Sequence, residues 1–140
     1  MNMRGIGLLV CLFMAASLYA EGVSVFVSFS MPENLLKETL KDCARLQVPA
    51  YLNGLHENSM QATAMKVMQL SQHVPGLNLL IDPTRFERFG IKQVPALVVE
   101  GNNTFDVIYG HLPLKEGLLR MAGRGDSGLT LANVRRLTGE

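Results

Sequence analysis

The chain has 140 residues, of which 48% are hydrophobic, and its formal net charge at pH 7 is +1. A chain of this length suits one domain with its own hydrophobic core. The charge balance argues against a nucleic-acid-binding protein, which normally shows a basic stripe. The three histidines are far apart and no paired Cys/His spacing is present, so no metal site is predicted.

Residues 1–20 have the pattern of a secretory signal peptide. Arg4 precedes an apolar run over residues 5–16, which is shorter than the roughly 20 residues of a membrane span. Ala20 offers a small residue for cleavage, so we expect an exported mature chain that begins after it. An uncleaved amino-terminal anchor is the alternative. Lipid attachment at Cys11 is rejected because a valine precedes it.

Cleavage would leave Cys43 as the sole cysteine, so the mature chain is expected to form no internal disulfide. Cys43 shares a helical face with Leu36 and Leu40, which indicates a structural role as a buried and inert thiol. The alternative is an intermolecular disulfide or a redox sensor, which requires an exposed thiol with a lowered pKa.

The first half of the mature chain reads as two strand–helix pairs. Residues 23–29 are rich in β-branched and aromatic side chains and predict the first core strand. Residues 48–53 predict a second strand, and Asn58 or Ser59 caps a helix that runs to His73. We expect the methionine-rich face of that helix to fill the core. This face comprises Met60, Ala64, Met65, Val67, Met68 and Ser71.

A compact strand–helix–strand segment follows. Residues 77–81 form a short apolar run that predicts a strand buried on both faces. Asp82 is placed to cap a short helix whose two phenylalanines share one face, and Gly90 is placed to end it. Pro95 cannot donate a ladder hydrogen bond, so it is expected at the first residue of the next strand.

The last third predicts a hairpin, a helix and a tail. Residues 101–103 are a turn signal, and residues 104–109 alternate as a half-exposed antiparallel strand that Gly110 closes. Pro113 opens a helix with its leucines on one side. Residues 123–140 are expected to be a flexible tail with a short helix, which either packs on the domain or waits for a partner.

Two stretches carry a family resemblance. The segment IDPTRFERFGIKQVPALVV resembles the thioredoxin superfamily, and together with VFVSFSMPENLLKETLKDCARLQVPAYLNGL it resembles the TrbC family of F-type conjugative pilus assembly proteins. The resemblance implies an α/β, thioredoxin-like domain over residues 21–122. Its central mixed sheet would have about five strands flanked by helices. An extra strand–helix unit would be inserted before the third strand.

The resemblance also locates a site. Redox members of the superfamily carry Cys-x-x-Cys where this chain has Ser30, Met31, Pro32 and Glu33, so both sulfurs are missing. We read Ser30 and Glu33 as a capping box and Met31 as an apolar contact at the rim of a groove. The groove residues implied for partner binding are Ser30, Met31, Pro32, Val94 and Pro95. No catalytic or cofactor-binding residue is predicted, and Cys43, Asp82, Gly90 and Gly110 are assigned structural roles.

The function implied by the resemblance is that of a periplasmic, non-catalytic assembly factor. It would serve pilus assembly and DNA transfer by an F-type type IV secretion system, through contact with a TraW-like assembly protein. One alternative is a thiol-disulfide oxidoreductase or isomerase accessory that acts through Cys43. The other is a general periplasmic holdase that binds unfolded peptides in the same groove.

Overall fold

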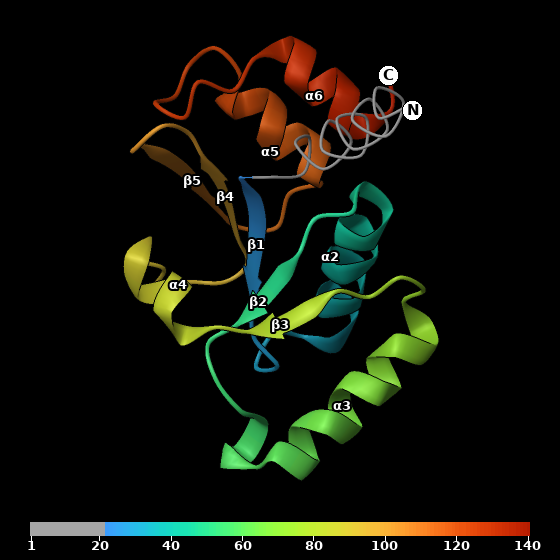
Figure 1. Ribbon diagram of the computed structural model, residues 1–140. Coiled ribbons are helices and arrows are strands. Elements are labelled where there is room, and N and C mark those ends of the chain that lie inside the picture. Colours follow the sequence, from blue (N-terminus) through green and yellow to red (C-terminus); the bar gives the residue numbers. More distant parts are fainter. Residues whose placement is uncertain (1–21) are drawn as a thin grey trace, which may run out of the picture.

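The computed structural model describes residues 22–140 (Figure 1). The predicted signal peptide at residues 1–20, with Cys11, lies outside the described residues. In chain order the strands are β1 (Val23–Val27), β2 (Ala50–Leu52), β3 (Leu79–Ile81), β4 (Ala96–Glu100) and β5 (Phe105–Tyr109). The helices are α2 (Glu33–Leu46), the single 3-10 turn η1 (His56–Asn58), α3 (Met60–His73), α4 (Pro83–Arg88), α5 (Leu114–Met121) and α6 (Leu131–Thr138).

The five strands form one mixed sheet in the order β3-β2-β1-β4-β5. β1, β2 and β3 run parallel, β4 is antiparallel to β1, and β5 is antiparallel to β4. The predicted α/β class, with a mixed sheet of about five strands flanked by helices, is confirmed. The likeness to thioredoxin, and the insertion of a strand–helix unit before the third strand, stay predictions.

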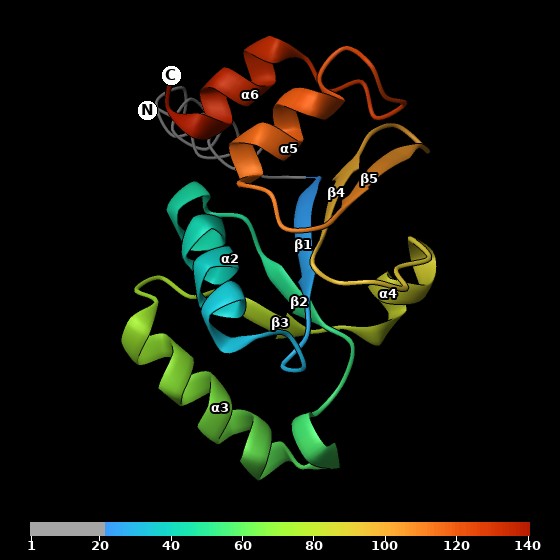
Figure 2. The same cartoon turned by 180° about the vertical axis from the view of Figure 1, so that it is seen from behind.

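The helices cover the two faces of the sheet unequally. Residues of α2, α3, α5 and α6 join alternate valines of β1 in the larger core on one face. On the other face, Phe86 and Phe89 at α4 contact Phe26 of β1, with ring centroids 4.8 and 5.9 Å apart. Both views place α4 on the opposite side of the sheet from α2 (Figures 1 and 2).

The start of α2 differs from the predicted capping box. Pro32 is the N-cap residue, and no side-chain hydrogen bond caps the helix. The Ser30 hydroxyl is instead paired with the Ser28 hydroxyl, with the two oxygens 2.8 Å apart. A serine side chain reaches the first-turn N–H groups only from the N-cap position. Ser30 lies two residues before that position, so the prediction is wrong.

The prediction that β3 is buried on both faces is also wrong. β3 is an edge strand, and Leu80 and Ile81 are 46% and 41% exposed. Its apolar run matches that of an interior strand, and periodicity over so few residues cannot separate the two positions. The pairing partner, which only the tertiary structure reveals, decides the burial of this strand.

The methionines of α3 lie on the opposite side from the one expected. The Ser59 side chain accepts a hydrogen bond from the backbone N–H of Ala62 and so caps the helix, at 3.1 Å. The buried positions of α3 are filled by Thr63 and Leu70. The three methionines are about two-thirds exposed and do not fill the core: Met60 67%, Met65 64% and Met68 65%.

The tail carries the expected short helix, which packs on the domain, one of the two alternatives that the sequence leaves open, so the tail is part of the fold and not a loose extension. α6 packs beside α5 (Figure 1), and Val134 is only 1% exposed within the larger core. Thr130 and Asn133 form a capping box, in which each side chain accepts a hydrogen bond from the other residue's backbone N–H. An apolar stripe and a complete cap together outweigh the marginal stability of so short a helix.

Candidate functional site

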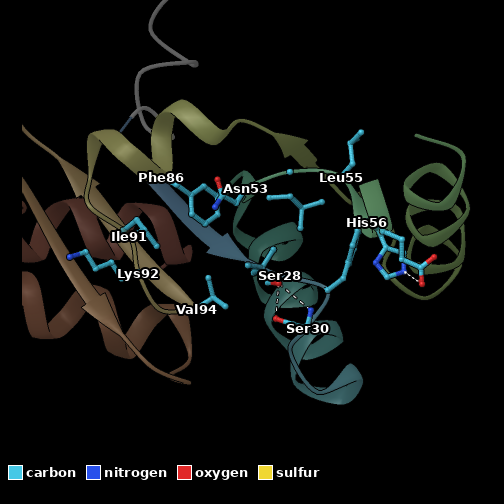
Figure 3. Close-up of a pocket in the computed structure, with 14 residues that line it drawn as sticks. Ser28, Ser30, Asn53, Leu55, His56, Phe86, Ile91, Lys92 and Val94 are labelled. Atoms are coloured by element: carbon cyan, nitrogen blue, oxygen red, sulfur yellow. Dashed lines mark hydrogen bonds and ion pairs between the residues drawn. The ribbon is translucent and has the colours of Figure 1, made fainter. Parts of the chain in front are cut away.

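A pocket of about 390 Å³ opens where β1 and β2 end (Figure 3). Because parallel strands place their carboxyl ends at the same edge of a sheet, the segments that follow β1 and β2 meet there. Phe86 of α4 and the segment between α4 and β4 add the opposite wall. The serine pocket, as we name it, is lined by Val27, Ser28, Phe29, Ser30, Leu52, Asn53, Gly54, Leu55, His56, Glu57, Phe86, Ile91, Lys92 and Val94.

The two serines of this pocket bind each other. The Ser28 and Ser30 hydroxyl oxygens are 2.8 Å apart, and the Ser30 backbone N–H donates to the Ser28 hydroxyl at 3.1 Å. A nucleophilic serine needs a general base within hydrogen-bond reach of its hydroxyl. In the described part of the chain, the hydroxyl partner of Ser30 is another serine and not an imidazole or a carboxylate. The arrangement is that of a polar lining.

His56 is held at the mouth of the pocket by structural contacts. Its ring packs edge-on against Phe29, with centroids 5.3 Å apart, and its backbone N–H donates to the Thr63 hydroxyl at 2.8 Å. Its Nε2 lies 3.9 Å from the Glu57 carboxylate. Figure 3 shows His56 apart from the two serines. This histidine therefore shapes the rim.

The structure brings together part of the predicted groove. Ser30 and Val94, which lie far apart in sequence, line the same pocket. Met31 does not lie at its rim, because its side chain points into the larger core and is only 8% exposed. Pro32 is exposed at the start of α2, and Pro95 is buried directly before β4, after a cis Val94–Pro95 bond.

Other pocket residues escaped the sequence reading. Asn53, Leu55 and His56 follow β2, and Lys92 precedes Val94. A signal for the first three was present, because they come directly after the second parallel strand, as Ser28 and Ser30 come after the first. Buried apolar side chains such as Leu52 and Phe86 line the pocket together with exposed residues such as Asn53 and Leu55. One lysine and one glutamate balance each other, so the pocket suits an uncharged side chain of a partner.

Cys43 lies on α2 within the larger core and is 2% exposed. Burial, the largest effect, together with the nearby Asp42 carboxylate, raises the pKa of its thiol to about 12. The thiolate is the reactive form of cysteine, so this thiol is almost wholly protonated and unreactive at neutral pH. It does not line the serine pocket.

Three other residues assigned structural roles lie at the ends of elements. The Asp82 side chain accepts a hydrogen bond from the Thr84 backbone N–H and caps α4. Hydrogen bonding from the Thr84 hydroxyl holds the pKa of the Asp82 carboxyl below its ordinary value. Gly90 follows α4 at φ +62° and Gly110 follows β5 at φ +110°, both in the region that favours glycine.

Within residues 22–140 no group of three or more His, Cys, Asp and Glu side chains lies close enough to hold a metal ion. In the same part of the chain no helix is long and apolar enough to cross a membrane.

Comparison with known proteins assigns the chain to a family. Residues 25–127 match the family of type-F conjugative transfer system pilin assembly proteins, so the chain belongs to that family and the predicted membership of the TrbC family is confirmed. The chain is 39% identical over 106 residues to the periplasmic protein TrbC of Escherichia coli strain K12. That match covers 76% of this chain and 50% of the relative, so the chain spans about half the relative's length. No solved structure matches.

Proposed function

We propose that this chain is a periplasmic, non-catalytic assembly factor of an F-type type IV secretion system. It serves pilus assembly and DNA transfer by contact with other proteins of the system. Membership of the pilin assembly family supports the role, and the location follows that of the E. coli relative. The chain spans about half of that relative's length. The role is therefore proposed for this chain and not for the regions of the relative that it does not match.

One observation carries the non-catalytic part of the proposal: the serine pocket is lined by two mutually bonded serines, while the sole cysteine of the described residues is buried elsewhere. Thiol-disulfide exchange needs an accessible thiolate. A raised pKa and near-complete burial both argue against such a role for Cys43. This argument disfavours the oxidoreductase alternative.

We propose further that the fold is thioredoxin-like and that the serine pocket stands where redox relatives place their cysteines. The pocket supports this reading because it joins the β1–α2 junction to the segment just before β4. The strand–helix unit β2–α3 would then be the insertion. In this view the scaffold keeps the recognition geometry of its superfamily and uses it to hold a partner.

The partner that we propose for the pocket is a TraW-like assembly protein, which would place an uncharged apolar side chain in it. Leu55, 38% exposed, and Lys92 are accessible at the rim and suit substitution without damage to the core. A side chain that fills such a pocket typically carries a large share of the binding energy.

Titration calorimetry of the mature chain with the purified TraW-like protein of the same transfer system tests this proposal. We expect the double variant Leu55→Asp, Lys92→Glu to weaken binding by at least about tenfold, a loss of roughly 1.4 kcal/mol. The matched control is Leu119→Asp, an equally exposed leucine (40%) on α5 that should bind like the natural chain. Equal affinity for all three proteins would exclude the pocket, and absence of binding would exclude this partner.

A further inference from the structure

A second surface, which shares no residue with the serine pocket, lies at the open edge of the sheet. It consists of the free edge of β3 and the exposed methionine row of α3, and we name it the β3–α3 surface. Natural proteins usually protect an edge strand with a lysine, a proline, a bulge or a cover, or by keeping it very short, as β3 is with three residues. The three residues of β3 are all apolar, whereas β5 at the opposite edge carries Asp106.

The backbone of β3 offers hydrogen-bonding groups to a further strand. The Ala50 N–H donates to the Asn78 carbonyl and the Asp82 N–H donates to the Leu52 carbonyl, both at 3.0 Å. Since backbone groups alternate in direction along a strand, those of Leu79 and Ile81 point away from β2. β3 ends the strand order, so these groups face the open edge.

The helix beside this edge presents an apolar and uncharged face. Met60, Ala64 and Met68 are spaced four residues apart and form one row, with Met65 beside them. None of the exposed residues of α3 is an aspartate, glutamate, lysine or arginine. The one lysine of α3, Lys66, is half-buried with its Nζ 3.9 Å from the Glu33 carboxylate of α2.

The methionine row lies on the flank of α3 that is turned away from α2. The opposite flank, with Lys66, Gln69 and His73, borders a crevice shared with residues of α2. Figures 1 and 2 both show α3 beyond β3, at the far end of the molecule from α5 and α6. Both α3 and the free edge of β3 therefore lie at the same end of the molecule.

We propose that the β3–α3 surface binds an extended, uncharged segment of another protein by strand addition. The segment would pair with the backbone groups of Leu79 and Ile81. Its alternate side chains would lie against the methionine row on one face of the sheet and against Leu80 on the other. A charged segment is disfavoured because the surface carries no partner for a charge that contact would desolvate. Methionine side chains adapt to varied apolar contacts, which suits such a surface.

A second copy of this chain fits the surface less well. Antiparallel edge-to-edge pairing of β3 with the β3 of another copy would place both copies of α3 on the same face of the extended sheet. Because α3 already projects beyond β3 in both views, the two helices would compete for the same space. A single added strand avoids that conflict, since it needs only the width of one strand, about 4.8 Å.

The test uses the ¹⁵N-labelled mature chain and a capped synthetic peptide of alternating threonine and valine. We expect amide shifts at residues 78–82 and along the methionine row, and an affinity that falls by about tenfold or more in the Ile81→Lys variant. A peptide N-methylated at alternate residues should not bind. The matched control, Leu119→Lys on α5, replaces a leucine of the same exposure and should bind like the natural chain.

Three results would overturn the proposal. They are no shift at β3 up to millimolar peptide, equal binding by the N-methylated peptide, and equal binding to the Ile81→Lys and natural chains. Concentration-dependent dimerisation that Ile81→Lys abolishes would replace strand addition by self-association. These outcomes do not depend on the serine pocket. If calorimetry detected no binding of the TraW-like protein, the result expected from the peptide titration would stay the same.

Discussion

The carboxylate of Asp106 in β5 binds the backbone of Ser127, 21 residues later. The Ser127 N–H donates to Oδ2 at 2.9 Å, and the neighbouring Asp126 N–H donates to Oδ1 at 2.8 Å. The Thr104 hydroxyl donates to the Asp126 carbonyl at 2.7 Å and completes the attachment. These bonds tie the glycine-rich segment before α6 to the β4–β5 hairpin. They explain why residues that read as a linker are held in place.

Replacing this carboxylate should loosen the tail. We expect Asp106→Ala to lower the free energy of unfolding by about 1 kcal/mol, because two N–H groups exchange an ionised acceptor for water. Amide hydrogen exchange should rise in residues 123–138 and stay unchanged in β1. The control Asp126→Asn alters a carboxylate beside the same turn without removing these acceptors. Unchanged exchange in the tail of Asp106→Ala would contradict this account.

The same carboxylate should give the tail a pH dependence. Burial raises the pKa of Asp106, but hydrogen bonds from the Ser127 hydroxyl and from the N–H groups of Asp126 and Ser127 outweigh it and hold the pKa below its ordinary value. The folded state therefore favours the ionised form. Its contribution is fully present above the ordinary aspartate pKa of about 3.9 and is lost as the pH falls through the lowered folded value. As the pH falls through this window, protection of the amides of residues 123–138 against hydrogen exchange should decrease. The decrease should be smaller in Asp106→Asn, which has no carboxyl group to titrate at this position.

The first turn of α5 depends on a carboxylate from α2. The Leu114 N–H donates to Asp42 Oδ2 at 2.6 Å, while Pro113 at the N-cap position supplies no side-chain cap. We expect Asp42→Ala to cost about 1 kcal/mol in urea unfolding, as does loss of an N-cap. The matched control is Glu116→Ala on α5, which removes an exposed ion pair with Arg120 and should cost less than about 0.5 kcal/mol. Equal effects of the two variants would argue against the long-range cap.

Gly101 is required by the close approach of the tail. A Cβ at this position would lie 2.1 Å from the Ser127 carbonyl oxygen, which belongs to the backbone and cannot turn aside. We expect Gly101→Ala to destabilise the fold by about 1–3 kcal/mol, as overpacking does. Gly54→Ala is the control, because a Cβ there meets nothing within 4 Å, and its effect should stay within about 0.5 kcal/mol. Thermal unfolding of both variants decides the comparison.

Much of this fold is readable from local sequence signals. The capped starts of α3 and α4, the buried face of α2 with Cys43, and the β4–β5 hairpin follow from spacing and turn chemistry. These features depend on neighbours in sequence, which the chain displays directly. Two residues of the serine pocket, Ser30 and Val94, are also identified from the sequence. Their proximity is implied only by the family resemblance.

The failed predictions depend on partners that are distant in sequence. β3 reads as an interior strand, yet its place at the edge is decided by which strand pairs beside it. The methionines of α3 read as core because hydrophobicity does not reveal which face of the helix meets α2. The tail reads as flexible because its attachment to Asp106 spans about twenty residues. In each case a contact with a residue distant in sequence decides the outcome, and local pattern does not reveal that contact.

The central claim is that this protein works by contact and not by thiol or hydroxyl chemistry. Its most direct test is the conjugative transfer frequency of a donor that lacks the chain and is complemented with variants. The account predicts near-natural transfer with Ser30→Ala, Cys43→Ala, and transfer lower by at least about tenfold with Leu55→Asp, Lys92→Glu at equal protein levels. Loss of transfer in the first variant, with its fold and level intact, together with natural transfer in the second, would contradict it.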